Sequence, residues 1–478
     1  MLFNSFEFAV FLPLVFFVYW FVCNKNLRLQ NLFIVSVSYL FYGWWDWRFL
    51  ILIAFTSLCS YLSGILLSKT RSDKKRRIIT ASNIVLNISI LCVFKYFNFF
   101  SENIVSLFKA FGLQLDWVTL DILLPIGISF YTFQALSYTI DSYKKRIEPT
   151  KDIVSFFAYV SFFPQLVAGP IERSTDLLPQ FSKKRYFDYE KAVKGLRQIL
   201  WGLFKKVVVA DTCAIAVNQT FENYHEYNSP QLWIGGILFS IQVYGDFSGY
   251  SDIAIGTAKL FGIDLMRNFN FPFFSRDVAE LWRRWHISLM TWFRDYVYIP
   301  LGGSRVSKWQ SARNTAIVFL LSGLWHGPKW AFIAWGAYTA LLLISFSLLG
   351  LNKKYTHHVA ENSIFPSLRE FSQMASTFIL FTIGVIIFRS ENLYHAWRYL
   401  AKMFVDFHLQ YQADFFGKQA LLFSGIMIIV EWLGRKKQFA IETLPFKSRW
   451  IRVIIYYIIA LTITIFGGEQ ITFIYFQF

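Results

Sequence analysis

The chain has 478 residues, of which 55% are hydrophobic, 20% are aromatic and only 16% are charged. Globular domains carry about 25% charged residues, and a soluble protein of this length could not bury so much apolar surface. The composition therefore excludes a soluble protein and indicates one that crosses a membrane several times. The formal net charge of +17 comes in short basic runs between apolar segments, which is typical of cytoplasmic loops rather than of nucleic-acid binding.

Apolar segments long enough to cross a bilayer, which takes about 20 residues, recur along the chain. No linker, repeat or low-complexity tract separates them, so we expect an all-α polytopic membrane protein with a single domain over residues 1–478 and about 11 spanning helices. The stretch 231–263 exceeds one simple span and is expected to bend near Gly245 or Gly249. The expected spans are 7–23, 31–45, 49–67, 78–97, 122–140, 195–217, 231–263, 329–349, 370–388, 418–433 and 450–468.

The basic runs orient these spans. No basic residue precedes the first apolar run, no cleavage site follows it, and Lys25 and Arg28 come directly after it. This pattern favours an uncleaved first span with the N-terminus outside. The loops expected on the inside are 24–30, 69–77, 141–147, 183–194 and 434–449.

One apolar stretch, 151–168, lies between two loops that are both expected inside. It ends in Phe163-Pro164-Gln165 and Ala168-Gly169-Pro170, and these residues break helices. We therefore expect a re-entrant hairpin that enters the membrane and returns on the same side, surrounded by protein or water.

A second hairpin is expected between the arginine-rich segment 264–313 and Lys353-Lys354. Two apolar stretches meet there at Trp325-His326-Gly327-Pro328. A histidine at the turn of a membrane hairpin is a functional-site hypothesis, because ionisable groups are costly in that position. The alternative is that the segment from Arg305 to Arg313 lies outside, in which case the positive-inside rule assigns it to the wrong side.

Segment 276–299 alternates apolar and basic residues at roughly helical spacing, for example in Trp282-Arg283-Arg284-Trp285-His286 and Trp292-Phe293-Arg294-Asp295-Tyr296. This pattern predicts a helix that lies in the membrane interface, with its tryptophans at the level of the lipid headgroups.

Among the seven histidines, His286 and His326 stand in apolar or aromatic surroundings, where a histidine is either used or a satisfied packing residue. Imidazole is well suited to accept a proton near neutral pH, and a sugar hydroxyl needs such a base as it attacks a thioester carbonyl. The histidines expected to be solvated are His225, His357, His358, His395 and His408.

Other chemistries find less support. The two apolar-environment histidines are 40 residues apart and no HExxH spacing exists, so we expect no metal site. The four cysteines, Cys23, Cys59, Cys92 and Cys213, form no CxxC pair. The segment 245–249 lacks the GxSxG elbow of serine hydrolases. The sequence leaves two readings open for Asp246 and Asp252. In the first they serve the candidate site. In the second they pair with basic residues or cap a helix kink.

Five motifs then occur in order and together resemble the membrane-bound O-acyltransferase family, bacterial branch. The likeness is nearer to its alginate O-acetylation members than to its teichoic acid D-alanylation members, and it covers nearly the whole chain. The motifs are Leu124-Pro125-Ile126-Gly127-Ile128-Ser129-Phe130, Phe163-Pro164-Gln165 with Ala168-Gly169-Pro170-Ile171, Asp246-Phe247-Ser248-Gly249-Tyr250-Ser251-Asp252, Phe274 and Arg276-Asp277 with Trp282-Arg283-Arg284-Trp285-His286, and Ser322-Gly323-Leu324-Trp325-His326-Gly327.

The resemblance implies a ring of helices, some re-entrant or interfacial, around a thinned centre with a tunnel. It implies that His326 is the catalytic histidine and His286 the second one. His326 is expected to act as general base toward the acceptor or a carrier, and His286 to serve donor binding or proton relay. Further residues expected to line the substrate tunnel are Trp325, Trp285, Arg283, Asp246, Asp252 and Asp295.

The resemblance also implies the partners. We expect no permanently bound cofactor and an acyl donor of the acetyl-CoA or acyl-carrier thioester type, used on the cytoplasmic side of a bacterial inner membrane. The acceptor is expected to be an exported polysaccharide, reached directly or through an exported acyltransferase or esterase-like partner protein. Membrane lipid surrounds the chain, and nucleic acid is not a partner.

Two other functions fit the broken helices less well. A transporter or flippase would use similar helices and internal polar residues, but it predicts internal repeats, which are absent from the sequence. A glycosyltransferase that uses a lipid-linked sugar would need acidic residues in an outer loop, where 218–230 offers only Glu222 and Glu226. Transfer of D-alanine or another acyl group to a cell-envelope polymer remains the alternative within the family.

The orientation can be tested by thiol labelling. In a chain whose four native cysteines are replaced by serine, single cysteines placed in loop 69–77 should resist a membrane-impermeant reagent added from outside, because the basic residues hold this loop inside. A cysteine before residue 6, expected outside, provides the positive control. Strong labelling of 69–77 from outside would reverse the topology.

Overall fold

The computed structural model describes residues 1–113, 124–167, 169–352, 355, 357–406, 417–467, 471 and 473–474, and among these it contains helices and no strand. The start of the expected span 122–140 and the residues Ala168, Lys353, Lys354 and His408 lie outside the described residues. The chain divides into two compact units, residues 1–192 with 257–266, and residues 193–256 with 267–478. Each unit is described by itself.

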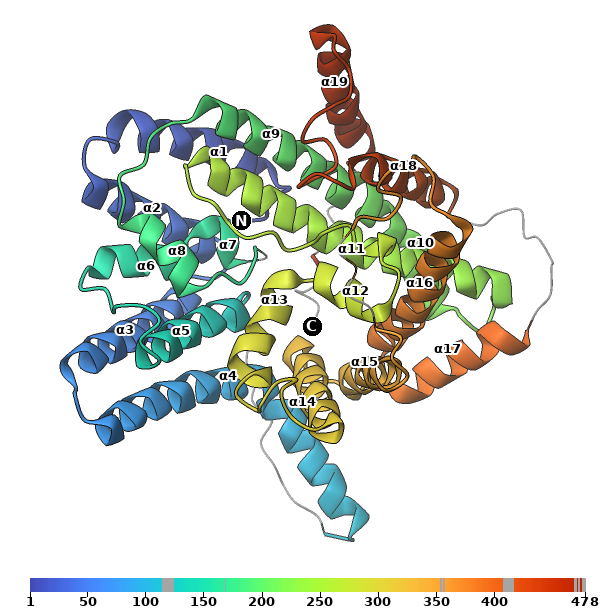
Figure 1. The fold of residues 1–478 in the computed structure, drawn as a ribbon, viewed down its shortest axis with the longest axis horizontal. Helices are drawn as coiled ribbons and strands as arrows, with labels where there is room; N and C mark the ends of the chain where they lie inside the picture. The colour runs from blue at the N-terminus through green and yellow to red at the C-terminus, as the bar shows by residue number, and fades with distance from the viewer. Residues whose placement is uncertain are drawn as a thin grey trace. The chain divides into compact units, whose positions relative to one another are not determined.

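The first unit consists of helices (Figure 1). They are α1 (Phe6–Phe17) with the π-helix η1 (Val18–Val22), α2 (Leu27–Gly43), α3 (Arg48–Lys69), α4 (Asp73–Ala110), α5 (Ile128–Tyr143), α6 (Ile153–Ser161), α7 (Phe163–Leu166) and α8 (Ser174–Phe181).

Two buried arginines bring the basic loops of this unit together. The Arg76 guanidinium donates to the carbonyl oxygens of Leu67, Ser142 and Tyr143, and so joins loop 69–77 to loop 141–147. The Arg185 guanidinium donates to the side chain of Gln30 in the first turn of α2. The loops that the positive-inside rule assigns to one side of the membrane therefore lie beside each other.

The stretch 151–168 does not form one continuous helix. Helix α6 ends at Ser161, and Phe162 leads with extended backbone into α7, which has 4 residues and starts with Pro164 in its first turn. The break expected from Pro164 is confirmed. That this segment returns to the side it came from stays a prediction.

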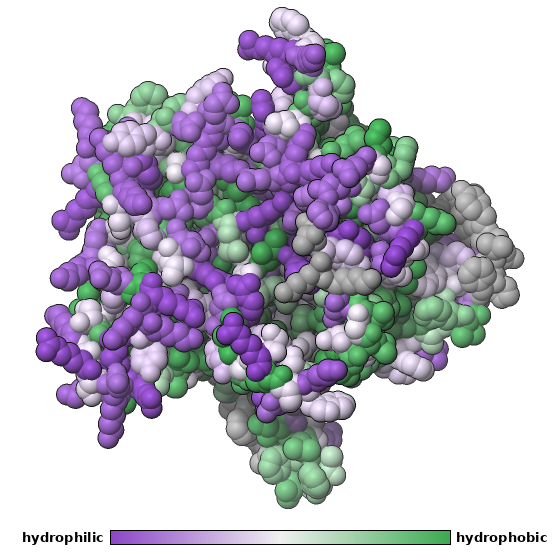
Figure 2. Space-filling model, in the orientation of Figure 1, coloured by the Kyte–Doolittle hydropathy of each residue, from purple (hydrophilic) through white to green (hydrophobic). Residues whose placement is uncertain are grey.

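Helix α4 has 38 residues and continues 13 residues beyond the span 78–97, since 110 − 97 = 13. No Gly or Pro interrupts residues 98–110, so nothing in the backbone chemistry ends the helix earlier. Its final turns expose Phe100 and Leu107, and Figure 2 shows apolar surface around this end of the helix.

The second unit holds the remaining helices (Figure 1). They are α9 (Tyr189–Leu203), which begins at the end of the first unit, the π-helix η2 (Phe204–Ala210), α10 (Asp211–Glu222), α11 (Ser229–Leu260), η3 (Pro272–Phe274), α12 (Val278–Arg284), α13 (Ile287–Phe293), the π-helix η4 (Arg294–Tyr298), α14 (Lys308–His326), α15 (Trp330–Leu348), α16 (Leu368–Arg389), α17 (Leu393–Val405), α18 (Lys418–Gly434) and α19 (Arg449–Phe466).

Helix α11 runs without interruption through Gly245 and Gly249, where we expected a bend. The glycines serve packing instead. A Cβ atom on Gly249 would lie 2.8 Å from the carbonyl oxygen of Gly202, and one on Gly256 would lie 2.5 Å from that of Gly195. Small residues thus let α11 approach the backbone of the run α9–η2, as in helix pairs within membranes.

Helices α14 and α15 form the predicted hairpin around His326. The chain leaves α14 at His326, passes Gly327 in extended backbone, and starts α15 at Trp330. The two helices touch over their length. A Cβ atom on Gly323 would clash with the carbonyl oxygen of Phe332, and one on Gly336 would clash with that of Phe319.

Two further expectations for the second unit are wrong. Segment 276–299 is not one interfacial helix but two short helices, α12 and α13, followed by η4. Its tryptophans Trp282, Trp285 and Trp292 are buried, and α12, which carries Trp282, packs against α15 and α16. His395, expected to be solvated, belongs to α17 and is half-buried, with its ring centroid 4.8 Å from that of Tyr224.

Five described helices are long and apolar enough to cross a membrane, namely α3, α4, α15, α16 and α19. The helix at Phe6–Val22 is apolar but shorter. The chain is accordingly a multi-pass membrane protein. By length and apolar composition, fewer of the described helices qualify as membrane spans than the sequence led us to expect.

The close approach of α14 and α15 predicts a specific sensitivity. Gly323→Ala places a methyl group against the backbone of α15, and we expect it to destabilise the detergent-solubilised protein by about 1–3 kcal/mol or more. Gly425→Ala in α18 is the matched control, because a Cβ there has no neighbour within 4 Å and removes a helix-interior glycine. Thermal unfolding midpoints measure both, and equal midpoints would contradict the packing argument.

Candidate active site

His326 ends α14 and is buried among aromatic rings. Its ring centroid lies 5.1 Å from those of Trp335 and Phe388, both nearly perpendicular to it. Trp335 comes from α15 and Phe388 from α16, so three helices enclose the imidazole. Such a dry pocket strengthens electrostatic interactions made by the ring.

His286 lies at the break between α12 and α13. Its φ of 43° is in the left-handed region, which costs a residue other than glycine about 1–2 kcal/mol. The surrounding structure holds it there, since the amide of Ile287 donates to the carbonyl oxygen of Asn268 at 2.8 Å. The His286 Nδ1 atom lies 3.0 Å from Asn268 Oδ1.

Trp325 connects the two histidines. Its ring centroid lies 5.0 Å from that of His326 and 5.9 Å from that of His286. Residues that are far apart in the sequence therefore meet in one buried cluster, and Trp325, expected to line the substrate tunnel, lies between them. The structure places all three residues as one candidate site, while their catalytic roles stay predictions.

Asp246 and Asp252 pair with lysines, which is one of the two readings that the sequence left open. Asp246 lies 2.7 Å from Lys206 Nζ, and Asp252 lies 2.7 Å from Lys205 Nζ. Both lysines are buried and belong to the π-helix η2. The two carboxylates therefore hold α11 to η2 and do not contact either histidine through any interaction seen among the described residues.

Glu431 completes this buried ion cluster. It accepts a hydrogen bond from Tyr244 at 2.8 Å and lies 3.8 Å from Lys205 Nζ. Sequence reasoning missed Lys205, Lys206 and Glu431. A signal existed, because charged residues inside the expected spans 195–217 and 418–433 mark paired groups by default.

Trp285, Arg283 and Asp295, all expected to line the substrate tunnel, do not share one site in the structure. Trp285 packs in the core, with its ring 4.8 Å from that of Phe381. Asp295 is buried and accepts from Arg294 Nε at 2.7 Å. Arg283 lines a cavity. Only Arg283 of these three is therefore in a position to meet a ligand in this cavity.

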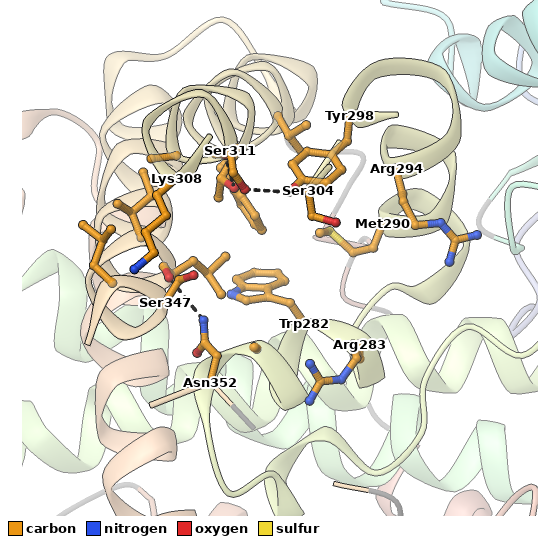
Figure 3. Close-up of a pocket in the computed structure, with 18 of the residues that line it drawn as sticks. Trp282, Arg283, Met290, Arg294, Tyr298, Ser304, Lys308, Ser311, Ser347 and Asn352 are labelled. Carbon is orange, nitrogen blue, oxygen red and sulfur yellow. Dashed lines mark hydrogen bonds between the residues drawn. The ribbon is translucent and has the colours of Figure 1, made fainter. Parts of the chain in front are cut away.

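The cavity has a volume of about 800 Å³ and is lined by residues of α12, α13, η4, α14 and α15. Arg283 and Arg294 lie on one side of the hollow and Lys308 on the other, with Trp282 between them (Figure 3). The remaining wall is largely apolar. Arg294 is paired with Asp295, so Arg283 and Lys308 are the cations that the cavity offers to a ligand. Two cations and largely apolar walls suit a ligand that combines phosphate groups with a flexible chain.

Neighbouring arginines are held by Glu280 and do not line the cavity. Glu280 accepts hydrogen bonds from Arg276 at 3.0 Å and Arg284 at 2.6 Å. Burial alone would raise the pKa of Glu280, but the hydrogen bond from Arg276 and the charge of Arg284 outweigh it and hold the pKa below its ordinary value. These ion pairs fix α12, and Arg283 is the arginine of this helix that lines the cavity.

Neither histidine is part of the cavity lining that the structure describes. Trp282 forms its wall, and the ring of Trp282 lies 5.6 Å from that of Trp335, which in turn contacts His326. A ligand in the cavity is thus separated from His326 by two tryptophan side chains. Among the described residues no group of three or more His, Cys, Asp or Glu side chains could hold a metal ion.

The motifs, the helical hairpin at His326 and the buried histidine pair define the class of this protein. The profile of the membrane-bound O-acyltransferase family matches residues 39–352, and the chain belongs to this family. It is therefore an acyltransferase, and the resemblance drawn from the motifs is confirmed.

The chain is also similar to individual proteins whose names state an activity. The chain is 38% identical over 409 residues to the probable alginate O-acetylase of Pseudomonas aeruginosa, covering 84% of this chain and 75% of that protein. It is 34% identical over 433 residues to the peptidoglycan O-acetyltransferase of Helicobacter pylori, covering 84% and 80%. It is 28% identical over 292 residues to the teichoic acid D-alanyltransferase of Bacillus subtilis, covering 56% and 70%.

Proposed function

We propose that this acyltransferase O-acetylates an exported polysaccharide and that His326 is the general base. The observation that carries the proposal is the placement of His326 in a buried aromatic cluster, at the break of a hairpin, with His286 on the other side of Trp325. The relatives named for O-acetylation of alginate and of peptidoglycan support acetyl as the group and a polysaccharide as the acceptor.

The reaction needs few parts. His326 takes the proton of an acceptor hydroxyl as the oxygen attacks the thioester carbonyl. The C–O bond forms, the C–S bond breaks, and the departing thiolate takes up the proton. The apolar cluster excludes water, so the thioester is not hydrolysed instead. His286 is the second group that exchanges a proton in this cluster.

The cavity is the proposed entry of the acyl donor, which is acetyl-CoA or an acyl-carrier thioester. Phosphate groups would meet Arg283 and Lys308, and the pantetheine chain would follow the apolar wall. The thioester has to pass Trp282 to reach His326, so movement of this side chain is part of the proposal.

The surroundings follow from the same proposal. We place the chain in a bacterial inner membrane, with about 11 spans around a central tunnel that leads from the donor side to the outer side. The described connections between helices offer no folded domain that could hold a long polymer. An exported acyltransferase or esterase-like partner therefore presents the polymer or completes the transfer.

The role of His326 is tested by replacing it with glutamine, which is similar in size and forms hydrogen bonds but is no base. His326→Gln should lower acetylation about 10²–10⁴-fold at matched protein level in the membrane. Acetyl content of the exported polysaccharide, measured against His225→Gln at an exposed position, reports the loss. Near-normal acetylation would mean that His326 only packs.

The donor site is tested by removing its cations. Arg283→Ala and Lys308→Ala should each raise the KM for acetyl-CoA about 10–100-fold, because a hydrogen bond to a charged group contributes about 1.5–3 kcal/mol and about 1.4 kcal/mol corresponds to a factor of ten. Release of CoA thiol by purified protein in liposomes provides the rate. Arg398→Ala, an exposed cation of α17 away from the cavity lining, is the control, and equal KM values for all variants would remove the donor from this cavity.

A further inference from the structure

Asn268 is buried with no exposed surface and lies in the segment between α11 and α12. Its carbonyl oxygen accepts from the amide of Ile287 at 2.8 Å. Its side-chain oxygen accepts from Ser288 Oγ at 2.9 Å and lies 3.0 Å from His286 Nδ1. Asn268 therefore fixes the backbone directly after the strained residue His286, through the amide of Ile287, and also the imidazole ring of His286 itself.

The backbone amide of Ser288 donates to the Asn268 side chain at 3.4 Å. Because a backbone N–H can only donate, the atom that faces it and the imidazole is the oxygen Oδ1. Asn268 Nδ2 then donates to Ser251 Oγ at 3.0 Å. Ser251 precedes Asp252, and Asp252 is held by Lys205 Nζ at 2.7 Å and by Gln198 Nε2 at 2.7 Å. The amide is thus fixed to the part of α11 that the buried ion pairs anchor.

An acceptor beside Nδ1 decides the tautomer of a neutral imidazole, because only a protonated Nδ1 can donate to it. The Nε2 atom then carries the lone pair. In the structure Nε2 of His286 is buried and meets no hydrogen-bonding group among the described residues. Its lone pair is available to a ligand that enters the cluster.

We propose that Asn268 is a positioning residue that locks His286 in the Nδ1–H tautomer and so makes Nε2 a proton acceptor. The lock also excludes transfer of a proton through the ring, since Nδ1 faces an amide oxygen that cannot take one up near neutral pH. His286 receives and returns its proton at Nε2 alone. This inference rests on the proposed function only where it concerns turnover.

The described groups in contact with the His286 ring come from several elements and carry no charge. Three are aromatic rings, whose centroids lie 4.6 Å (Phe247 of α11), 6.4 Å (Phe269) and 5.9 Å (Trp325 of α14) from that of His286. The other two are the polar side chains of Asn268 and Ser288. A carboxylate introduced at position 268 would be the one charge against the ring. It would favour the imidazolium form and move the loss of activity on the acid side to higher pH.

The tautomer itself is measured without any substrate. The full chain, with ¹⁵N-labelled histidine and reconstituted in liposomes, is compared with His286→Gln, so that the lost signal in solid-state NMR assigns His286. We expect a protonated Nδ1 and an unprotonated Nε2 in the unmodified protein, and loss of this preference in Asn268→Leu. A protonated Nε2 in the unmodified protein, or an unchanged tautomer in Asn268→Leu, overturns the proposal.

Turnover adds a second readout from CoA thiol release with acetyl-CoA. Asn268→Leu should lower kcat about 10–100-fold, the range known for metal-bound histidines that lose an orienting partner, with little change in KM. Asn268→Asp, close in size, should retain more activity but shift the acid limb of the pH profile upward. Asn270→Leu and Asn270→Asp, two residues away, are the matched controls and should leave both kcat and the pH profile unchanged.

The outcomes separate the two proposals. If the unmodified protein and His286→Gln release thiol at the same rate, the proposed function of the site fails while the tautomer measurement still decides the role of Asn268. If His286→Gln is inactive but Asn268→Leu and Asn268→Asp match the unmodified protein in kcat and pH profile, the positioning role fails and the proposed function stands.

Discussion

Close backbone contact between helices is the constraint on which the site depends. Lipid tails are as apolar as the side chains, so helices in a membrane gain little from hydrophobic association and rely on tight packing. Gly323 and Gly336 let the backbones of α14 and α15 touch, and the same contact fixes His326 at the hairpin end. With larger residues there, the helices would separate and the rings of Trp335 and Phe388 would no longer enclose the imidazole.

The glycines of α11 allow a second close contact, and charges hold it in place. Gly249 and Gly256 bring α11 against α9 and η2, where Lys205 and Lys206 meet Asp252 and Asp246. A buried ion pair adds little net stability, because desolvation offsets most of the attraction. Breaking one, however, leaves an uncompensated charge, so the pairs restrict how the helices can register. Ser251 and Asn268 carry that restriction to His286.

Much of this could be read from the sequence, and the failures have physical reasons. The hairpin at His326 was predictable because Gly327 and Pro328 mark the break by themselves. The break at His286 was not, because no Gly or Pro lies between residues 278 and 293 and the left-handed conformation is imposed by Asn268 from another segment. The tryptophans of that segment were assigned to the membrane interface because a sequence in which Trp and Arg alternate is the same whether the tryptophans lie in a protein core or at the lipid headgroups. The pairing of Asp246 and Asp252 was left open, although Lys205-Lys206 inside an expected span was the signal that would have decided it.

The two histidines meet different surroundings, and this difference fits a division of labour. His326 is enclosed by rings from three helices. His286 is held by hydrogen bonds to a fixed amide, an environment that sets the position of its proton as well as its ring. In the function proposed above, His286 accepts a proton at one defined nitrogen, and this requires a rigid hydrogen-bond partner on the other nitrogen. Trp325 is in contact with both rings and so keeps the two imidazoles in one buried cluster.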